Sequence, residues 1–157
     1  MAKGPFMEFL RALVVQTAIN TYQEIQMPTP TSKTENMAML IHSIELYPTN
    51  ILAGSIANGD VLHAHLSKTT KTAPGKVADA DILAEYRAYA ALAEIFHDTV
   101  YMGSQKHTFD PPILYPHANL YAAIQTTGFT SVVSLNVRVG YTLEKVSRED
   151  FISALVE

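Results

Sequence analysis

The sequence predicts an all-β domain, an antiparallel β-sandwich or barrel, and three observations carry this prediction. First, apolar and polar residues alternate from Val133 to Glu144, which is the period of a strand with one buried face. Second, several shorter apolar runs are separated by turns rich in Gly, Pro, Asn and Thr. Third, the connection between the last two of these runs, at Thr127-Gly128, is too short for the crossover that parallel strands need.

Length and composition predict one domain over residues 1–157. A chain of 157 residues can bury a core of its own, and a hydrophobic share of 48% is ordinary for a folded protein. The charged share of 17% is low, which favours a subunit that covers part of its surface with neighbours. A net charge of −4 argues against a polyanion-binding chain. The absence of cysteine excludes disulfides, thiolate metal sites and cysteine nucleophiles.

The segment Val132–Val146 is predicted to be a core strand. Its large apolar side chains would share one face, because successive side chains of a strand point to opposite sides. These side chains are Val133, Leu135, Val137, Val139, Tyr141 and Leu143. The run Leu120–Thr126 precedes it, and Thr127-Gly128 between them predicts a turn. The two strands are therefore expected to belong to an antiparallel arrangement.

Further strands are expected upstream. The segment Asn36–Leu46 is apolar on both faces at its start, as in a doubly buried strand. A turn at Asn58-Gly59 introduces a strand over Val61–Ser67, and residues 69–76 are expected to form a polar loop. Prolines on both sides of Ile113–Tyr115 predict a short edge or extended piece, because proline cannot donate to a central sheet ladder.

Two helices are predicted. The segment Asp79–Phe96 is rich in alanine and has apolar residues at helical spacing, so we expect one helix inserted between strands. The pattern Ser147-x-x-Asp150 resembles a capping box, and the apolar residues after it predict a short C-terminal helix.

Residues 1–14 are predicted to be an N-terminal assembly arm. Four apolar side chains there have the spacing of one helical stripe, which requires a partner surface. They are Phe6, Phe9, Leu10 and Leu13. The stretch from Leu13 to Ile25 also fits the alternation of a strand, but we expect a short amphipathic helix and then a strand that ends near residues 27–30. A neighbouring subunit or a lipid surface would be the partner of the stripe.

The pair His63 and His65 is the candidate metal site. Residues two apart on a strand share a face, so both rings could reach one ion. The pair follows Gly59 and resembles the first half of a cupin metal motif, but neither the expected glutamate nor the later glycine-proline-glycine-histidine element follows. We therefore predict no metal and no cofactor. The sequence contains no nucleophile elbow, phosphate loop or dinucleotide fingerprint, so we predict no catalytic residues and no enzyme.

The order of elements resembles that of single jelly-roll capsid proteins of small icosahedral viruses. The resemblance extends from about Leu13 to Val146 and rests on the segments 36–46, 119–128 and 132–142. It implies a jelly-roll fold and a coat subunit of a virion that assembles with copies of itself, and possible partners are other capsid proteins or a membrane beneath the shell. In one respect the chain departs from many such proteins, because its first thirty residues contain only Lys3 and Arg11 as cations. Direct binding of nucleic acid by this arm is therefore doubtful.

The leading functional hypothesis is thus a structural, self-assembling capsid subunit. Jelly rolls also include lectins and cupins, so fold alone does not decide the function. The alternatives are a lectin-like carbohydrate-binding module and a cupin-like metal-dependent enzyme built on His63 and His65.

Overall fold

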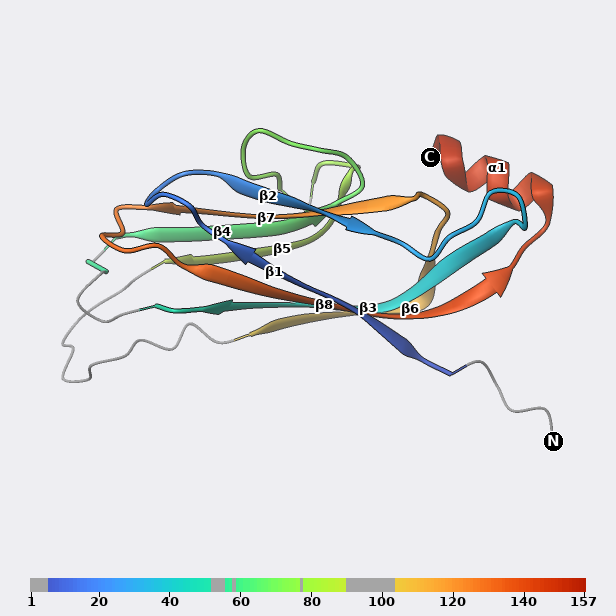
Figure 1. Cartoon of the computed structure of the whole chain (residues 1–157), viewed down its shortest axis with the longest axis horizontal. Helices are drawn as coiled ribbons and strands as arrows, with labels where there is room; N and C mark the ends of the chain where they lie inside the picture. Colours follow the sequence, from blue (N-terminus) through green and yellow to red (C-terminus); the bar gives the residue numbers. More distant parts are fainter. Residues whose placement is uncertain (1–5, 52–55, 58, 77, 90–103) are drawn as a thin grey trace.

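The structure is a computed structural model of the chain, and it describes residues 6–51, 56–57, 59–76, 78–89 and 104–157. Two four-stranded antiparallel sheets pack face to face as a sandwich, and one helix closes one end (Figure 1). No helix in these residues is long and apolar enough to cross a bilayer.

The first sheet, sheet A, has the strand order β1-β8-β3-β6. Its strands are β1 (Glu8–Val15), β3 (Met37–Thr49), β6 (Gln105–Tyr115) and β8 (Ser134–Lys145). The second sheet, sheet B, has the order β2-β7-β4-β5. Its strands are β2 (Gln23–Pro28), β4 (Val61–Ser67), β5 (Ile82–Tyr89) and β7 (Asn119–Thr127).

This strand order is that of a jelly roll. The pairs β1–β8, β2–β7, β3–β6 and β4–β5 are each antiparallel and nest inside one another, like the two arms of one long hairpin. When such a hairpin rolls up, its successive strand pairs fall alternately in one sheet and in the other. Two further pairings, β8 with β3 and β7 with β4, join the pairs within each sheet. The sandwich predicted from the sequence is therefore confirmed, and the described part of the chain contributes eight strands to its two sheets.

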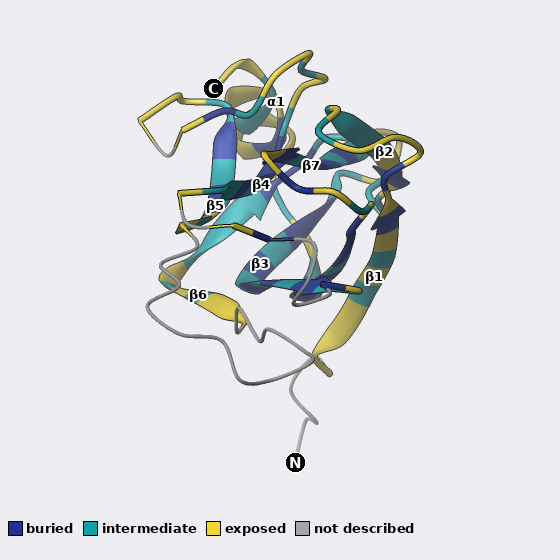
Figure 2. Ribbon diagram, turned by 90° about the vertical axis from the view of Figure 1, so that its left-hand side faces the viewer, coloured by how far each residue is buried: buried dark blue, intermediate teal, exposed yellow. Residues whose placement is uncertain are grey.

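The core lies between the two sheets, where their inner faces meet (Figure 2). The predicted strand at the C-terminus is confirmed as β8, which lies between β1 and β3. Its side chains Leu135, Val137 and Val139 are at most 2% exposed, so the predicted apolar face is the buried one.

The start of β3 is buried on both faces, since Ala38 and its neighbour Met39 are both fully buried, and a bulge then changes which residues face the core. The register against β8 shifts between Ile41 and Ser43, which inserts His42 as an extra residue. Met39 and Ile41 before the bulge and Ile44 and Leu46 after it are all fully buried, although their numbers differ in parity. The predicted strand is confirmed, and it extends to Thr49.

The predicted strands at β4 and β7 are also confirmed. The short extended piece predicted at residues 113–115 is the end of the longer strand β6, which lies at the edge of sheet A, where prolines are tolerated. Gly128 follows β7 with a φ of +88°, and a side chain there would collide with Asp60, so glycine is required at this turn.

The inserted helix predicted at Asp79–Phe96 is wrong where the structure describes it. Residues 82–89 form β5, which pairs with β4, while residues 90–96 lie outside the described residues. Ile82, Ala84 and Tyr86 are buried and alternate with more exposed residues. This two-residue period is that of a strand with one buried face. As a strand, β5 forms the edge of sheet B next to β4.

The N-terminal helix predicted within residues 1–14 is also wrong, because residues 8–15 form β1. Leu10 and Ala12 pack against the core and Val14 is fully buried. This part of the predicted arm is therefore a strand of the sandwich, and residues 1–5 lie outside the described residues.

The C-terminal helix is confirmed as α1 (Arg148–Val156). The Ser147 side chain caps it by accepting a hydrogen bond of 3.0 Å from the Asp150 backbone N–H, as the Ser-x-x-Asp pattern predicts. Phe151 is 2% exposed and anchors the helix on the sandwich.

Candidate functional site

Strand β1 leaves one edge of sheet A open. It is the terminal strand of the sheet and pairs only with β8, so within the described residues its other side has no strand partner. Such an edge carries free backbone N–H and C=O groups that can pair with another chain. Natural proteins usually protect an open edge with charged side chains, and β1 contains only Glu8 and Arg11.

The outward side of this edge is apolar. Six large apolar side chains on and around β1 are between 40% and 74% exposed, and we call them the β1 strip. They are Phe6, Met7, Phe9, Leu13, Val15 and Ile19. Figure 2 shows the N-terminal half of β1 as largely exposed. An exposed apolar strip of this kind is a candidate contact surface.

The four predicted interface residues do not form one stripe. Phe6, Phe9 and Leu13 belong to the β1 strip, but Leu10 points inward and packs against the core. The reason is the two-residue period of a strand, which separates Leu10 from its odd-numbered neighbours.

A groove on the outer face of sheet A adjoins the β1 strip. It has a volume of about 420 Å³ and crosses the strands β1, β8 and β3. Its lining combines apolar and charged side chains, namely Arg11, Ala12, Leu13, Glu45, Tyr47, Asn136, Val137 and Arg138.

Two arginines face each other in this groove. Arg11 and Arg138 are directly opposite in the β1–β8 register, and like charges in this position destabilise a sheet. The Arg138 guanidinium lies 4.0 Å from the centre of the Phe9 ring, over its face. Within the described part of the chain neither arginine forms an ion pair with a carboxylate, although Glu45 is opposite Arg138 on β3. The groove thus combines two arginines with one glutamate.

The histidines of the candidate metal site lie on the outer face of sheet B, on β4. His63 Nε2 is 2.8 Å from Glu85 Oε1 on β5, but its N–H is not aligned with that oxygen. His65 is fully buried, and its two nitrogens face different partners. Its Nδ1 accepts from the Gly75 N–H at 3.0 Å, and its Nε2 lies 3.3 Å from the Tyr22 hydroxyl.

These hydrogen bonds define the state of His65. Because Nδ1 accepts, the neutral ring carries its proton on Nε2 and donates it to Tyr22, which in turn donates to Glu24 at 2.7 Å. Burial lowers the pKa of His65 to about 4 and also lowers that of His63. No group of three or more metal-ligating side chains occurs among the described residues. The arrangement holds the loop at Gly75 against the sheet.

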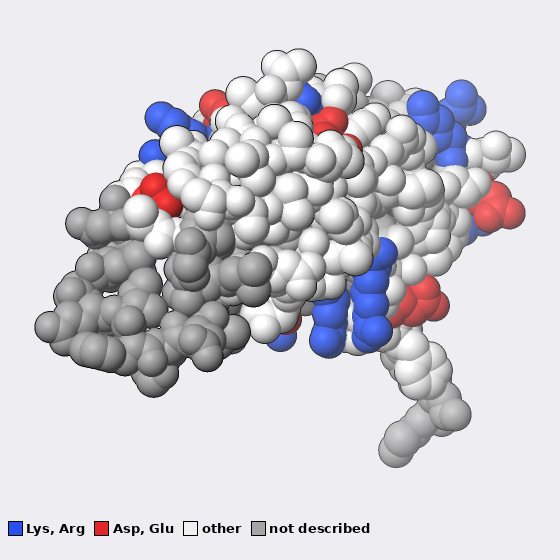
Figure 3. All heavy atoms as spheres, turned by 60° about the vertical axis from the view of Figure 1, so that its left-hand side comes forward, with Lys and Arg blue, Asp and Glu red and all other residues white. Residues whose placement is uncertain are grey.

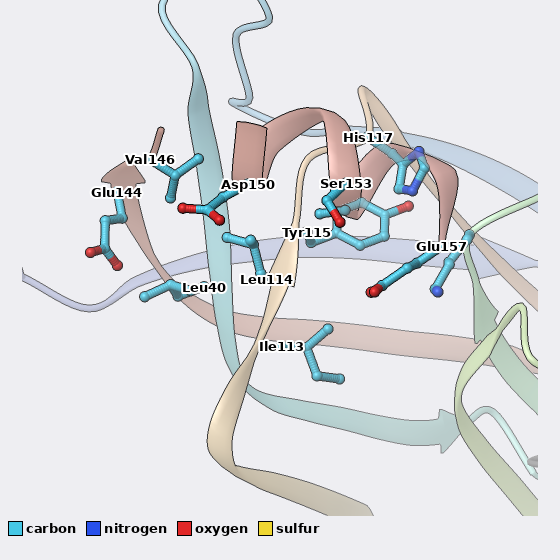
Figure 4. Close-up of a pocket in the computed structure, with 12 residues that line it drawn as sticks. Leu40, Ile113, Leu114, Tyr115, His117, Glu144, Val146, Asp150, Ser153 and Glu157 are labelled. Atoms are coloured by element: carbon cyan, nitrogen blue, oxygen red, sulfur yellow. The ribbon is translucent and has the colours of Figure 1, made fainter. Parts of the chain in front are cut away.

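A second pocket, of about 470 Å³, lies beside α1 (Figure 4). Asp150, Ser153 and Glu157 line it from the helix, and Tyr115 and His117 line it from the end of β6 and the loop that follows. Burial lowers the pKa of His117, and nearby lysines lower it further. The acidic and basic side chains of this lining do not converge on one point.

The sequence did not predict the groove on sheet A. Arg138 occupies a polar position of the predicted strand, and its outward direction followed from the alternation. That it faces Arg11 depends on the pairing of β1 with β8, more than a hundred residues apart, which a single sequence does not reveal. On the face in Figure 3, charged side chains form a few small groups and uncharged residues cover most of the described surface.

Comparison of the chain with models of known protein families and with curated proteins found no match. What the structure shows is the class of fold: the described residues form an eight-stranded jelly-roll sandwich with an open, apolar edge at β1.

Proposed function

We propose that this protein is a self-assembling structural subunit and that it serves as the coat protein of a virus particle, in an icosahedral shell built from copies of itself. The observation that carries the proposal is the β1 strip on an open strand edge. An apolar edge that stays exposed invites uncontrolled aggregation, whereas a specific assembly covers it.

The fold supports the proposal without deciding it. Jelly rolls of this strand order serve in viral capsids, lectins and cupins, and the function depends on the surface that each presents. Here the described surface presents an apolar strip and an arginine groove on one sheet, while His65 is occupied by structural hydrogen bonds. We therefore favour a subunit that assembles into the virus particle and has no catalytic role.

The test is the size of the purified protein. Analytical ultracentrifugation over a range of concentrations, with negative-stain microscopy of the heavy fractions, should show closed particles of uniform size. A chain that stays monomeric at the highest soluble concentration would overturn the proposal. Binding of glycans by such a monomer would favour the lectin-like alternative.

A variant links the assembly to the β1 strip. Leu13→Asp places a charge at a side chain that is 52% exposed, so the subunit should fold as before but assemble poorly. The control is Thr34→Asp, on an exposed turn away from β1, which should assemble like the parent.

A further inference from the structure

We propose that residues 68–76, the first part of the loop between β4 and β5, form a cover over the outer face of sheet B that acid releases. This segment, the cover loop, is closed at neutral pH and opens when the ring of His65 becomes protonated, while the sandwich stays folded. The inference goes beyond the proposed function and does not depend on it. It stands on the hydrogen bonds that join the cover loop to sheet B.

The cover loop is held by hydrogen bonds rather than by burial. Gly75 is the only buried residue from 68 to 76, and a side chain there would collide with Ile82. In Figure 1 the loop between β4 and β5 projects outward from sheet B. Ser67 and Ile82 pair with each other where the two strands end, and both are buried. The cover loop can therefore leave the sheet while β4 and β5 stay paired.

The end of the cover loop is bound through His65. The Gly75 N–H donates to His65 Nδ1 at 3.0 Å, and His65 Nε2 donates to the Tyr22 hydroxyl at 3.3 Å. The Tyr22 hydroxyl donates in turn to Glu24 on β2 at 2.7 Å. Every direction in this run is fixed, because a backbone N–H can only donate and an ionised carboxylate can only accept.

The start of the cover loop is bound at the other end of the same run. The Glu24 carboxylate accepts from the Thr70 hydroxyl and, at 2.9 Å, from the Lys71 backbone N–H. The Lys71 ammonium pairs with Asp81 at 3.1 Å, which joins the loop to its own return arm and not to the sheet. Contact with the sheet thus depends on Glu24 at the start of the cover loop and on His65 at its end.

Protonation of His65 is incompatible with the closed loop. An imidazolium carries a proton on both nitrogens, so Nδ1–H would point at the Gly75 N–H, and neither group could accept. The side chain of His65 is fully buried, so its new charge would also lack water. Opening of the cover loop removes both penalties, because water can then accept from Nδ1–H and from Gly75.

The charged groups around His65 do not remove this conflict. Two acids favour the protonated ring and two bases oppose it, while Ala123, the residue opposite on β7, is uncharged. The acids are Glu24 on β2 and Glu85 on β5, and the bases are His63 on β4 and Lys71 in the cover loop. Burial has a larger effect than any of them and lowers the pKa of His65 to about 4.

The closed and open states therefore bind different numbers of protons. In the open state the hydrated ring regains its ordinary pKa of 6.5, so between pH 6.5 and about 4 the open state holds a proton that the closed state lacks. The ratio of open to closed chains rises as the pH falls through this window. The expected rise is on the order of 100-fold between pH 7 and pH 4.

Hydrogen exchange of the full-length chain, followed by NMR, tests the opening. After correction for intrinsic exchange, the protection of the Gly75 amide should fall on the order of 100-fold between pH 7 and pH 4. Urea below the unfolding transition should leave this exchange unchanged, since a local opening exposes little surface. Exchange of Ala64, inside sheet B between β5 and β7, should instead accelerate with urea.

Two matched variants assign the effect to His65. In His65→Asn the side-chain oxygen can still accept from the Gly75 N–H but does not titrate, so the protection of Gly75 should vary less than 3-fold, or about half a logarithmic unit, over the same pH range. The control is His42→Asn, which changes a half-buried histidine on sheet A and should keep the pH dependence of the parent. If His65→Asn does not fold, an NMR titration of the His65 ring in the parent decides. The ring should then take up its proton over the range in which Gly75 loses protection.

Three results would overturn the inference. The first is a corrected protection of Gly75 that does not change with pH. The second is exchange of Gly75 that accelerates with urea as much as that of Ala64, because the loop would then open only when the whole sandwich unfolds. The third is a folded His65→Asn variant with the pH dependence of the parent, or a His65 ring that titrates outside the range of the opening.

Discussion

At the scale of single residues, Val137 is a central position of the sandwich. It is 2% exposed at the middle of β8, with Ala12 on one neighbouring strand and Leu46 on the other. Such a position tolerates no polar group, because a buried charge without a partner loses its hydration and gains nothing in return.

Val137→Asp should therefore lower the free energy of unfolding by several kcal/mol, roughly 3 or more. Urea denaturation followed by circular dichroism measures the change. The control is Val132→Asp, the same substitution at a residue that is 40% exposed, with an expected change of about 0.5 kcal/mol or less. Equal stability of the two variants would mean that the inner face of β8 is wrongly assigned.

His65 makes the stability of the protein depend on pH. Its pKa is about 4 in the folded chain against 6.5 for a free histidine, so between these values the unfolded chain binds a proton that the folded chain does not. The free energy of unfolding should thus fall as the pH drops from about 6.5 towards 4, by up to about 1.4 kcal/mol per pH unit for this one group.

His65→Asn should remove this contribution, since the asparagine oxygen can still accept from the Gly75 N–H but does not titrate. Urea denaturation between pH 4 and 7 should show a shallower slope in the variant, whatever its stability at pH 7. His63 and His117 titrate in both proteins and cancel in the comparison. An unchanged slope would show that His65 is not the responsible group.

At the scale of elements, the sequence was sufficient where a clear local signal was present. The strand β8 was predicted from its alternation, β4 and β7 from the turns beside them, and α1 from its cap at Ser147. For β1 the pattern failed because Phe9 and Leu13 outside are as apolar as Leu10 and Val14 inside, so no two-residue period is visible.

The helix predicted at β5 failed for a different reason. The alanine-rich composition favours a helix locally, and the four-residue spacing of Ile82 and Tyr86 fits one face of a helix as well as one face of a strand. Ala84 is buried between them, but its small side chain adds little to the alternation. Pairing with β4 decides the structure, and this tertiary contact overrides the local preference.

Strand β1 leads to a prediction about truncation. Deletion of residues 1–12 should strongly destabilise the domain, because it removes Leu10 and Ala12 from the core and unpairs most of one edge of β8. Deletion of residues 1–7 should leave the melting temperature within a few degrees of the parent, since β1 begins at Glu8. Thermal unfolding by circular dichroism distinguishes the two, and similar melting of both would show that β1 is dispensable.

At the scale of the whole molecule, the open edge of β1 determines what the protein can build. Within the described residues β1 pairs with β8 alone, and the exposed side chains of the β1 strip lie on and around it. If the strips of two copies met each other, the contact would be two-fold and would stop at a dimer, whereas a shell requires the strip to meet a different surface of the next subunit.

A mixture of the parent with the Leu13→Asp variant tests which kind of contact the β1 strip makes. The variant has lost the strip, whereas its other surfaces are intact. If the strip meets a different surface of the next subunit, the variant still binds the strip of a parent subunit and ends growth there, so an excess of variant should reduce the yield of closed particles. Sedimentation velocity measures this yield, with Thr34→Asp in the same excess as the control. Particles that form in full yield beside a monomeric variant would contradict a contact between different surfaces.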